Sequence, residues 1–277
     1  MPELAEVEFY RKRWALAATG EKIIAVKAHE NARIFRGTDV AALRETLEGA
    51  KFVSSATAAK QMLFRFNRDG WLGLHLGMSG ELLVEAPGYL PRRHDHLVLG
   101  ARGKTLVFSD PRMFGRVQFH RGKKAPAWWT GIAPAILSKE FTVSAVTKFL
   151  RRRARAPIKA VLLMQAQFPG VGNWMADEIL WRAALHPTRL AGSLKPAEVQ
   201  ALWRECRRVC RLALDAIAGR GKRLPPDLNV NIPKNWLFQH RWKKGGRCPV
   251  TGQPLAHAVV GGRTTCWSPA LQKLSAP

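Results

Sequence analysis

The stretch MQAQFPGVGNWMADEILW, residues 164–181, decides the fold of the second half of the chain. One helical pattern ends before the turn Gly170-Val-Gly172, and a new helical pattern begins at Asn173. The glycines allow the backbone N–H groups at the start of the new helix to face outward, which makes a site for phosphate. The stretch predicts a helix–turn–helix unit that contacts a nucleic-acid backbone. An αα-hairpin with a plain glycine turn is the alternative.

The charge of the whole chain favours the first interpretation. Its 277 residues include 45 Lys and Arg against 20 Asp and Glu, a formal net charge of +25. Such an excess indicates a polyanionic partner, usually nucleic acid, with an acidic membrane surface as the rival. No apolar run reaches the roughly 18 residues that a membrane span needs. The first residues, MPELAEVEF, are acidic and lack the apolar segment of a secretory signal.

The four cysteines indicate a reducing, intracellular setting. They are too few and too scattered for a disulfide scaffold, and they stand at Cys206, Cys210, Cys248 and Cys266. The first two lie within a long helical pattern, 196–219, whose apolar residues recur at helical spacing. We therefore expect this pair to pack in a core rather than bind a metal.

Around the quoted stretch, the second half of the chain reads as helical. Further helices are expected over 143–153, where Thr142 is a cap, over 157–167 and over 173–185. The segment 219–247 is basic and rich in Pro, Gly and Asn, which is typical of a linker or loop, and we assign no structure to 219–240. The tail from 247 reads as a hairpin, with Gly261-Gly262 as its turn.

The first half reads as mostly β. A helix over 6–20 ended by Gly20 and a second over 40–49 capped by Asp39 flank short strands punctuated by glycine. Such strands predict a sandwich or barrel. They are expected over 22–28, 61–66, 70–85, 95–100, 104–110 and 115–120. An irregular, Pro-, Ala- and Trp-rich segment, 123–140, marks the boundary with the helical half.

The first candidate for chemistry is the N-terminus, Met1-Pro2-Glu3. A small second residue permits removal of the initiator Met, which would leave Pro2 as a free secondary amine. A terminal amine titrates near 7.7–8.0, so a useful fraction is a neutral nucleophile at physiological pH. Glu3 could move protons beside it. Taken alone, Met-Pro-Glu is also an ordinary start.

Three further motifs carry candidate residues. Lys60 opens a strand in TAAKQMLFRF, where a lone Lys is usually just solvated. In HLGMSGELLV, residues 75–84, glycines bracket Met78 at a tight turn, which suits a wedge inserted into DNA. In FSDPRMFGR, residues 108–116, an Asp-Pro turn presents Arg112 and Phe114, a pair that can stack on bases. A surface loop with one buried Phe is the alternative.

In this order, the segments resemble the formamidopyrimidine-DNA glycosylase/endonuclease VIII family of base-excision repair enzymes. The similarity covers MPELAEVE, with Ala5 where Pro is common, and then AAKQMLF, HLGMSG, RHDHLVL, DPRMFGR and GVGNWMADEILWRAALHP. It implies an α+β fold: an N-terminal β-sandwich with flanking helices (1–130), a helix–two-turn–helix domain (131–222), and a basic loop with a zincless β-hairpin finger (223–277).

The resemblance also implies residue roles. Pro2 would attack the sugar C1′ and form a Schiff base, while Glu3 would help to open the deoxyribose ring. Lys60, at the active site, and Asn173 would bind phosphates. Met78, Arg112 and Phe114 would fill the gap left by a flipped nucleotide, whose loss of stacking costs a few kcal/mol. Glu6 is expected in the base pocket, and the remaining expected DNA contacts are His75, Gly170, Gly172 and Arg263.

The tail departs from the family pattern of Cys-x2-Cys, about sixteen residues, Cys-x2-Cys. Cys248 fits the first ligand, but the other three positions hold Thr251, Ser268 and Leu271. Because zinc needs about four N or S donors, we expect no zinc and no other cofactor. A small apolar cluster of Leu255, Val259, Trp267 and Leu271 is expected to replace the metal. Arg263, near the hairpin tip, would still reach a phosphate.

The predicted function is a bifunctional DNA glycosylase and AP lyase that excises oxidised bases and cleaves the strand by β,δ-elimination. The expected partner is double-stranded DNA with oxidised bases or abasic sites. We expect a monomer that is cytoplasmic, of bacterial type and nucleoid-associated. Two alternatives stay open: a catalytically silent binder of damaged DNA or structured nucleic acid, and an AP lyase with little base excision.

Overall fold

The computed structural model describes residues 2–242 and 245–274, and the chain divides into two units. The first comprises Met1–Ile132 and Ala218–Pro226, and the second comprises Ala133–Ile217 and Asp227–Pro277. No helix among the described residues combines the length and the apolar character needed to cross a membrane.

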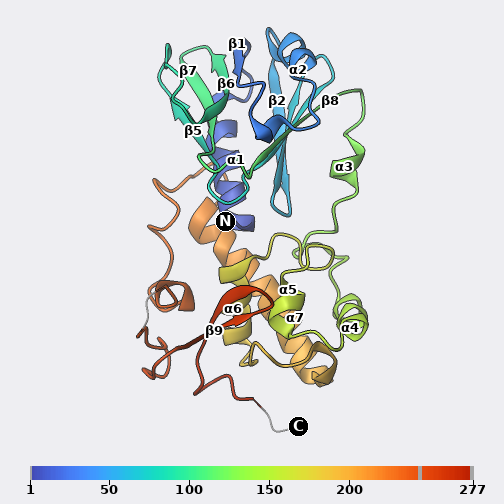
Figure 1. The fold of residues 1–277 in the computed structure, drawn as a ribbon, viewed down its shortest axis with the longest axis vertical. Helices are drawn as coiled ribbons and strands as arrows, with labels where there is room; N and C mark the ends of the chain where they lie inside the picture. The colour runs from blue at the N-terminus through green and yellow to red at the C-terminus, as the bar shows by residue number, and fades with distance from the viewer. Residues whose placement is uncertain (1, 243–244, 275–277) are drawn as a thin grey trace. The chain divides into compact units, whose positions relative to one another are not determined.

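Two four-stranded antiparallel sheets form the β-sandwich of the first unit (Figure 1). One sheet has the order β1-β6-β7-β5 and comprises β1 (Ile23–Ala28), β5 (Glu81–Glu85), β6 (Asp95–Ala101) and β7 (Lys104–Ser109). The other has the order β2-β3-β4-β8 and comprises β2 (Phe52–Ala58), β3 (Gln61–Phe66), β4 (Gly70–His75) and β8 (Arg116–Arg121). Buried side chains such as Phe64 and Phe108 fill the core.

Helix α1 (Leu4–Ala18) is anchored to both sheets, because it packs on β5 and on β2 and β3. Trp14 is buried against Phe64, with ring centroids 5.3 Å apart, and its indole N–H donates to the Leu83 carbonyl at 2.9 Å. The other helical segments of this unit are η1 (Arg33–Phe35), α2 (Val40–Leu47), whose N-cap is Asp39, and α3 (Ala127–Thr130). The anchored helix fixes the backbone that follows Pro2 and Glu3.

A segment for which the sequence offered no interpretation is tied to α1 by one side chain. The buried Lys12 ammonium donates to the carbonyls of Ala218, Gly219 and Arg223 at 2.7, 2.8 and 3.0 Å. Residues 218–226 therefore belong with the sandwich, although they follow the last long helix of the second unit.

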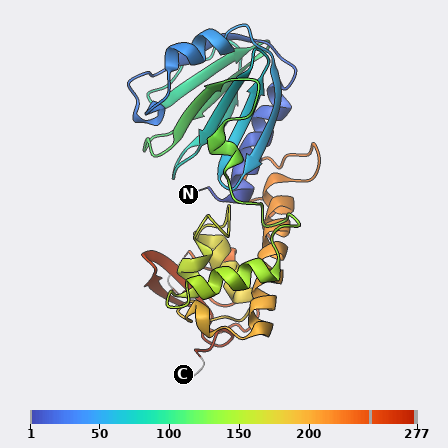
Figure 2. The same ribbon diagram turned by 90° about the vertical axis from the view of Figure 1, so that its right-hand side faces the viewer.

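The second unit is helical and ends in a two-stranded hairpin (Figure 2). Its elements are α4 (Val143–Arg152), α5 (Ile158–Leu162), α6 (Asn173–Arg182), η2 (Ala191–Ser193), α7 (Pro196–Ala213), η3 (Leu214–Ala218, which runs one residue beyond the unit), η4 (Leu237–Gln239), β9 (Ala256–Val260) and β10 (Arg263–Trp267). Thr142 caps α4 as expected. Cys206 and Cys210 are fully buried on α7, which confirms their packing role.

Two expectations about the elements were wrong. Strand β2 was missed because its sequence, FVSSATA, is small and polar and lacks a clear alternation of apolar residues. The helix expected over 157–167 ends at Leu162. There the Gln165 side chain donates to the Leu163 and Val171 carbonyls and accepts from the Gly170 N–H, and such side-chain bonds compete with a continuing helix.

Candidate functional site

The expected nucleophile and its neighbour lie at the start of α1. Pro2 is half-buried, and Glu3 is only 2% exposed. The Glu3 N–H donates to the Glu6 carboxylate at 3.1 Å, so Glu6 fastens the first turn of the helix. Met1, whose removal the expected chemistry requires, lies outside the described residues. The arrangement fixes the chain directly after Pro2.

Lys60 and His75 lie at the same end of neighbouring strands, Lys60 in the turn before β3 and His75 at the end of β4. Lys60 is nearly buried in the tight turn between β2 and β3, one residue before the strand that it was expected to open. His75 pairs with Gln61, which follows Lys60. The His75 Nδ1 accepts the Gly77 N–H at 3.0 Å, and burial together with the charges of Lys60 and Arg36 lowers its pKa. His75 is therefore a neutral hydrogen-bonding group at pH 7.

The three expected gap-filling residues lie on two loops that touch. Met78 is 39% exposed and Phe114 is 44% exposed, although both are large apolar side chains. The Arg112 guanidinium lies over the Phe114 ring, 4.8 Å from its centroid. A Cβ on Gly77 would stand 2.4 Å from the Phe114 carbonyl carbon, so only glycine permits this approach of the two loops. The structure thus brings all three residues together at exposed loop tips.

A residue that the sequence did not single out joins these loops. Asp110 is fully buried, and its carboxylate accepts the Ser79 hydroxyl at 2.8 Å and the Gly115 N–H at 2.7 Å. It also accepts the Arg112 N–H at 3.3 Å. The stretch FSDPRMFGR held a signal for this role. An Asp that begins a turn after a buried strand commonly accepts hydrogen bonds from the backbone N–H groups of that turn.

The second unit brings together the expected phosphate-binding residues. Helix α6 begins at Asn173, directly after the glycine turn, and Gly170 has a φ of +90°. The Asn173 side-chain amide donates to the Thr264 carbonyl at 2.8 Å, next to Arg263. Arg263 is exposed at the first position of β10. Gly172 and Asn173 on the glycine turn and Arg263 on the hairpin therefore lie on two segments that this hydrogen bond joins.

Buried charges hold the hairpin on α6. Asp177 is 1% exposed, and its carboxylate binds the buried Lys159 ammonium, the Arg241 guanidinium at 2.6 Å and the Cys266 backbone N–H at 3.1 Å. Beside it, burial raises the pKa of Glu178, although Arg182 lies at 2.8 Å and the Phe238 N–H also donates to it. Sequence reasoning missed this network, whose signal was an Asp-Glu pair within an otherwise apolar helix.

The tail residues do not fit a zinc ion. Cys248 is buried with the hydroxyls of Thr251 and Ser268 around it; burial would raise the pKa of its thiol, but hydrogen bonding from these residues lowers it to about 7. Three of the expected ligand positions, Cys248, Thr251 and Ser268, thus lie close together, but only Cys248 supplies a sulfur that could bind zinc. Among residues 2–242 and 245–274, no group of three or more His, Cys, Asp or Glu could hold a metal ion.

An apolar cluster occupies the base of the hairpin, and only some of its residues are those that the sequence predicted. It contains Trp181, Leu237, Cys248, Leu255 and Cys266, with Leu271 packed against it. The expectation for Val259 was wrong, because this side chain points to solvent at 73% exposure. Trp267 instead packs edge-on against His186, with centroids 5.2 Å apart. The strand alternation places Cys266, not Trp267, on the inner face.

The comparisons with known proteins agree with these features. Residues 1–117 match the formamidopyrimidine-DNA glycosylase N-terminal domain, and residues 132–222 match the formamidopyrimidine-DNA glycosylase H2TH domain. Formamidopyrimidine-DNA glycosylases of Roseiflexus sp. (strain RS-1) and of Thermus thermophilus are each 34% identical to the chain. The Roseiflexus relative aligns over 99% of this chain and 100% of its own length. The Thermus relative aligns over 98% of both chains.

Solved structures of similar fold were determined with damaged DNA. MutM in complex with DNA containing carbocyclic 8-oxo-G has a TM-score of 0.87 at 25% identity, covering 99% of this chain and 100% of that one. The Lactococcus lactis enzyme, bound non-covalently to DNA with an AP site, has a TM-score of 0.83 at 25% identity, covering 98% and 100%. Because both domain models match and the relatives align end to end, the chain belongs to the formamidopyrimidine-DNA glycosylase family.

Proposed function

We propose that the chain is a DNA glycosylase with AP lyase activity that removes oxidised bases through Pro2. The observation that carries the proposal is the joint presence of a Pro2-Glu3 start anchored on α1 and the exposed Met78, Arg112 and Phe114 on a sandwich of this family. A protein that only binds DNA needs a wedge and cations, but it has no use for an N-terminal Pro-Glu.

In the proposed reaction, the neutral Pro2 nitrogen attacks the sugar C1′, and the bond from C1′ to the damaged base breaks. The base leaves with the bonding electrons and takes up a proton, while the Pro2 nitrogen loses its own. Glu3 donates a proton to the ring oxygen, which opens the sugar and leaves an iminium at C1′. No cofactor is required.

The iminium makes the proton at C2′ acidic. Loss of that proton expels the 3′ phosphate by β-elimination, and a second elimination expels the 5′ phosphate. Water then hydrolyses the iminium and frees Pro2. Each elimination leaves a phosphate monoester on a strand end.

The other proposed roles concern DNA binding. Met78, Arg112 and Phe114 would replace the extruded nucleotide in the stack, because extrusion costs a few kcal/mol of stacking. Lys60, His75, Asn173 and Arg263 would contact phosphates or the sugar around it, with the backbone of Gly170 and Gly172. Glu6 would line the base pocket. We also propose that the hairpin works without zinc, since Asp177 and the apolar cluster hold its base.

Borohydride trapping tests the proposal directly. The protein is incubated with borohydride and duplexes that carry 8-oxoguanine, Fapy-guanine, an oxidised pyrimidine or an abasic site. We expect a covalent adduct, which Pro2→Gly abolishes while duplex binding is kept. Mass spectrometry should show that Met1 is absent from the active protein. No adduct with any duplex, despite retained binding to damaged DNA, would instead identify a catalytically silent binding protein.

A further inference from the structure

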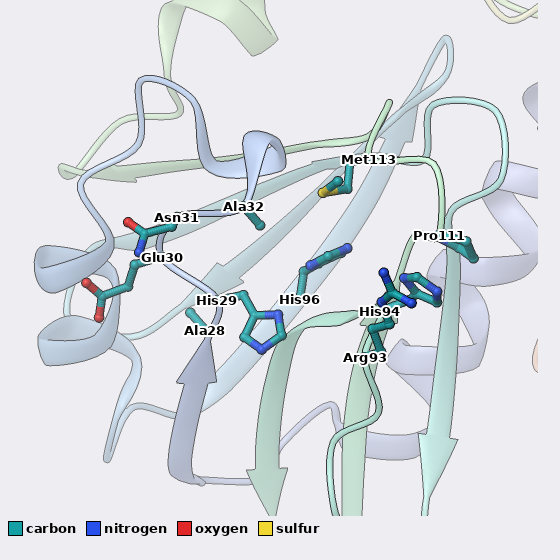
Figure 3. A pocket seen from close by; sticks show the side chains of 10 residues that line it. All are labelled: Ala28, His29, Glu30, Asn31, Ala32, Arg93, His94, His96, Pro111 and Met113. Atoms are coloured by element: carbon teal, nitrogen blue, oxygen red, sulfur yellow. The ribbon is translucent and has the colours of Figure 1, made fainter.

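A hollow on the first unit, beside the loop that carries Arg112 and Phe114, has no part in the proposed reaction. Its volume is about 620 Å³, in the range of small-molecule sites. Figure 3 shows the side chains that line it. They come from the end of β1, the loop after it, the segment that leads into β6, and the turn after β7: Ala28, His29, Glu30, Asn31, Ala32, Arg93, His94, His96, Pro111 and Met113.

His96, which lines the hollow, has an unused hydrogen-bonding atom. The side chain is only 4% exposed, and its Nε2 lies 3.1 Å from the Asp110 carbonyl oxygen. A carbonyl only accepts, so Nε2 carries the proton and Nδ1 keeps a lone pair. This Nδ1 is buried and has no partner among the described residues. A buried acceptor without a donor is destabilising, so the site favours a ligand that can donate a hydrogen bond.

The rim of the hollow favours an anion. Arg93 and His29 are exposed there, and His94 is half-exposed. The rings of His29 and His96 lie 5.7 Å apart, so a single small ligand can reach both. The one carboxylate on the rim, Glu30, is paired with Arg44 and is thus largely neutralised. The histidines do not form a metal site within the described part of the chain.

We propose that this hollow binds a phosphate monoester. Its charged oxygens would accept hydrogen bonds from Arg93 and His29, and its remaining hydroxyl would donate to the His96 Nδ1. A phosphate monoester has a second pKa near 6, so this hydroxyl is available close to neutral pH. A phosphate diester, such as the continuous DNA backbone, lacks it. The ligand is either free phosphate or the phosphorylated end of a cleaved strand.

Calorimetric titration of the full chain near pH 6.5 tests the class of ligand. Inorganic phosphate and methyl phosphate should bind saturably, whereas dimethyl phosphate and sulfate, which lack the hydroxyl at this pH, should bind at least about tenfold more weakly. Arg93→Ala should weaken methyl phosphate about tenfold. Arg102→Ala, which removes the same charge from an exposed turn outside the hollow, should leave binding unchanged. Equal binding of dimethyl phosphate, or no saturable binding of methyl phosphate, would overturn the proposal.

Nitrogen-15 NMR of labelled histidine provides a measurement that does not depend on a variant's folding. Methyl phosphate should shift the His96 Nδ1 resonance while Nε2 stays protonated; an unmoved Nδ1 at saturation would contradict the assignment.

Binding of oligonucleotides distinguishes the two sources of the phosphate. A 5′-phosphorylated oligonucleotide that binds more tightly than its 5′-hydroxyl counterpart, with the difference lost in Arg93→Ala, identifies a strand end. Binding of small phosphates without that difference identifies free phosphate. Neither measurement needs strand cleavage, so the outcome is separate from that of borohydride trapping.

Discussion

The Ser79 hydroxyl donates a 2.8 Å hydrogen bond to the buried Asp110 carboxylate, and this contact fastens the loop of Met78 to the loop of Arg112 and Phe114. The other carboxylate oxygen accepts the Gly115 N–H, so both loops depend on one side chain. We therefore propose that the three gap-filling residues act as one preorganised wedge rather than as three independent side chains.

Asp110→Asn should loosen this wedge. An amide has one acceptor oxygen, whereas the Arg112 and Gly115 N–H groups bond to different oxygens of the carboxylate, so one of these two backbone donors loses its acceptor, at a cost of about 1–3 kcal/mol in the free energy of unfolding. We expect slower extrusion of a damaged base, measured by the fluorescence of 2-aminopurine placed beside it, and a smaller effect on a preformed abasic site. Asp69→Asn, at an exposed turn of the same unit, is the control. Equal extrusion rates in both variants would contradict the role of Asp110.

Asp177→Ala should release the hairpin. The change leaves the buried Lys159 and Arg241 without their common anion, and such unpaired buried charge costs about 3–5 kcal/mol. Chemical denaturation measures the loss, and binding to abasic-site DNA should weaken because Arg263 is no longer held. Glu30→Gln breaks a solvent-exposed pair and should cost about 0–1 kcal/mol. A comparable small cost for Asp177→Ala would show that the network does not support the unit.

Metal removal should have no effect on this protein. Elemental analysis of the purified chain is expected to find no stoichiometric zinc, because Cys248 is the only sulfur at the four expected ligand positions. The melting temperature should be the same with and without a strong chelator. One zinc per chain, together with a lower melting temperature in chelator, would refute the zincless hairpin.

Acidification below about pH 6.5 should destabilise the chain, because burial lowers the pKa of His96 and of His75 in the folded state. The unfolded chain binds protons in this window that the folded chain does not, so the free energy of unfolding falls as the pH falls. Glu178, whose pKa is raised, acts in the opposite direction. Comparison with His96→Gln isolates one contribution: the variant should lose less stability on going from pH 7 to pH 5. An identical loss would contradict the prediction.

Local patterns in the sequence predicted the elements that rest on local physics. Glycine positions, the Asp39 and Thr142 caps and the apolar run in β3 were sufficient to place their segments. Long-range partners were not predictable in this way. Asp177 and Arg241 are 64 positions apart, and a charged residue in an apolar helix does not reveal which distant side chain neutralises it. The bond between Asp110 and Ser79, which are 31 positions apart, escaped notice for the same reason.

The hairpin tip offers a matched pair of glycines. Both Gly261 and Gly262 have positive φ, +59° and +74°, as the two-residue turn requires. A Cβ on Gly261 would lie 2.6 Å from the Ala160 Cβ on α5, whereas one on Gly262 meets nothing within 4 Å. The backbone strain of an Ala substitution is thus similar at the two positions, on the order of 1 kcal/mol, but only Gly261→Ala also forces the tip away from α5.

Gly261→Ala should therefore displace Arg263 and weaken binding to abasic-site duplex by about tenfold or more, equivalent to about 1.4 kcal/mol. Gly262→Ala should weaken binding much less. Fluorescence anisotropy with a labelled duplex measures both, and Arg263→Ala sets the scale for complete loss of the contact. If the two glycine variants bind alike, the packing of the tip on Ala160 does not position Arg263.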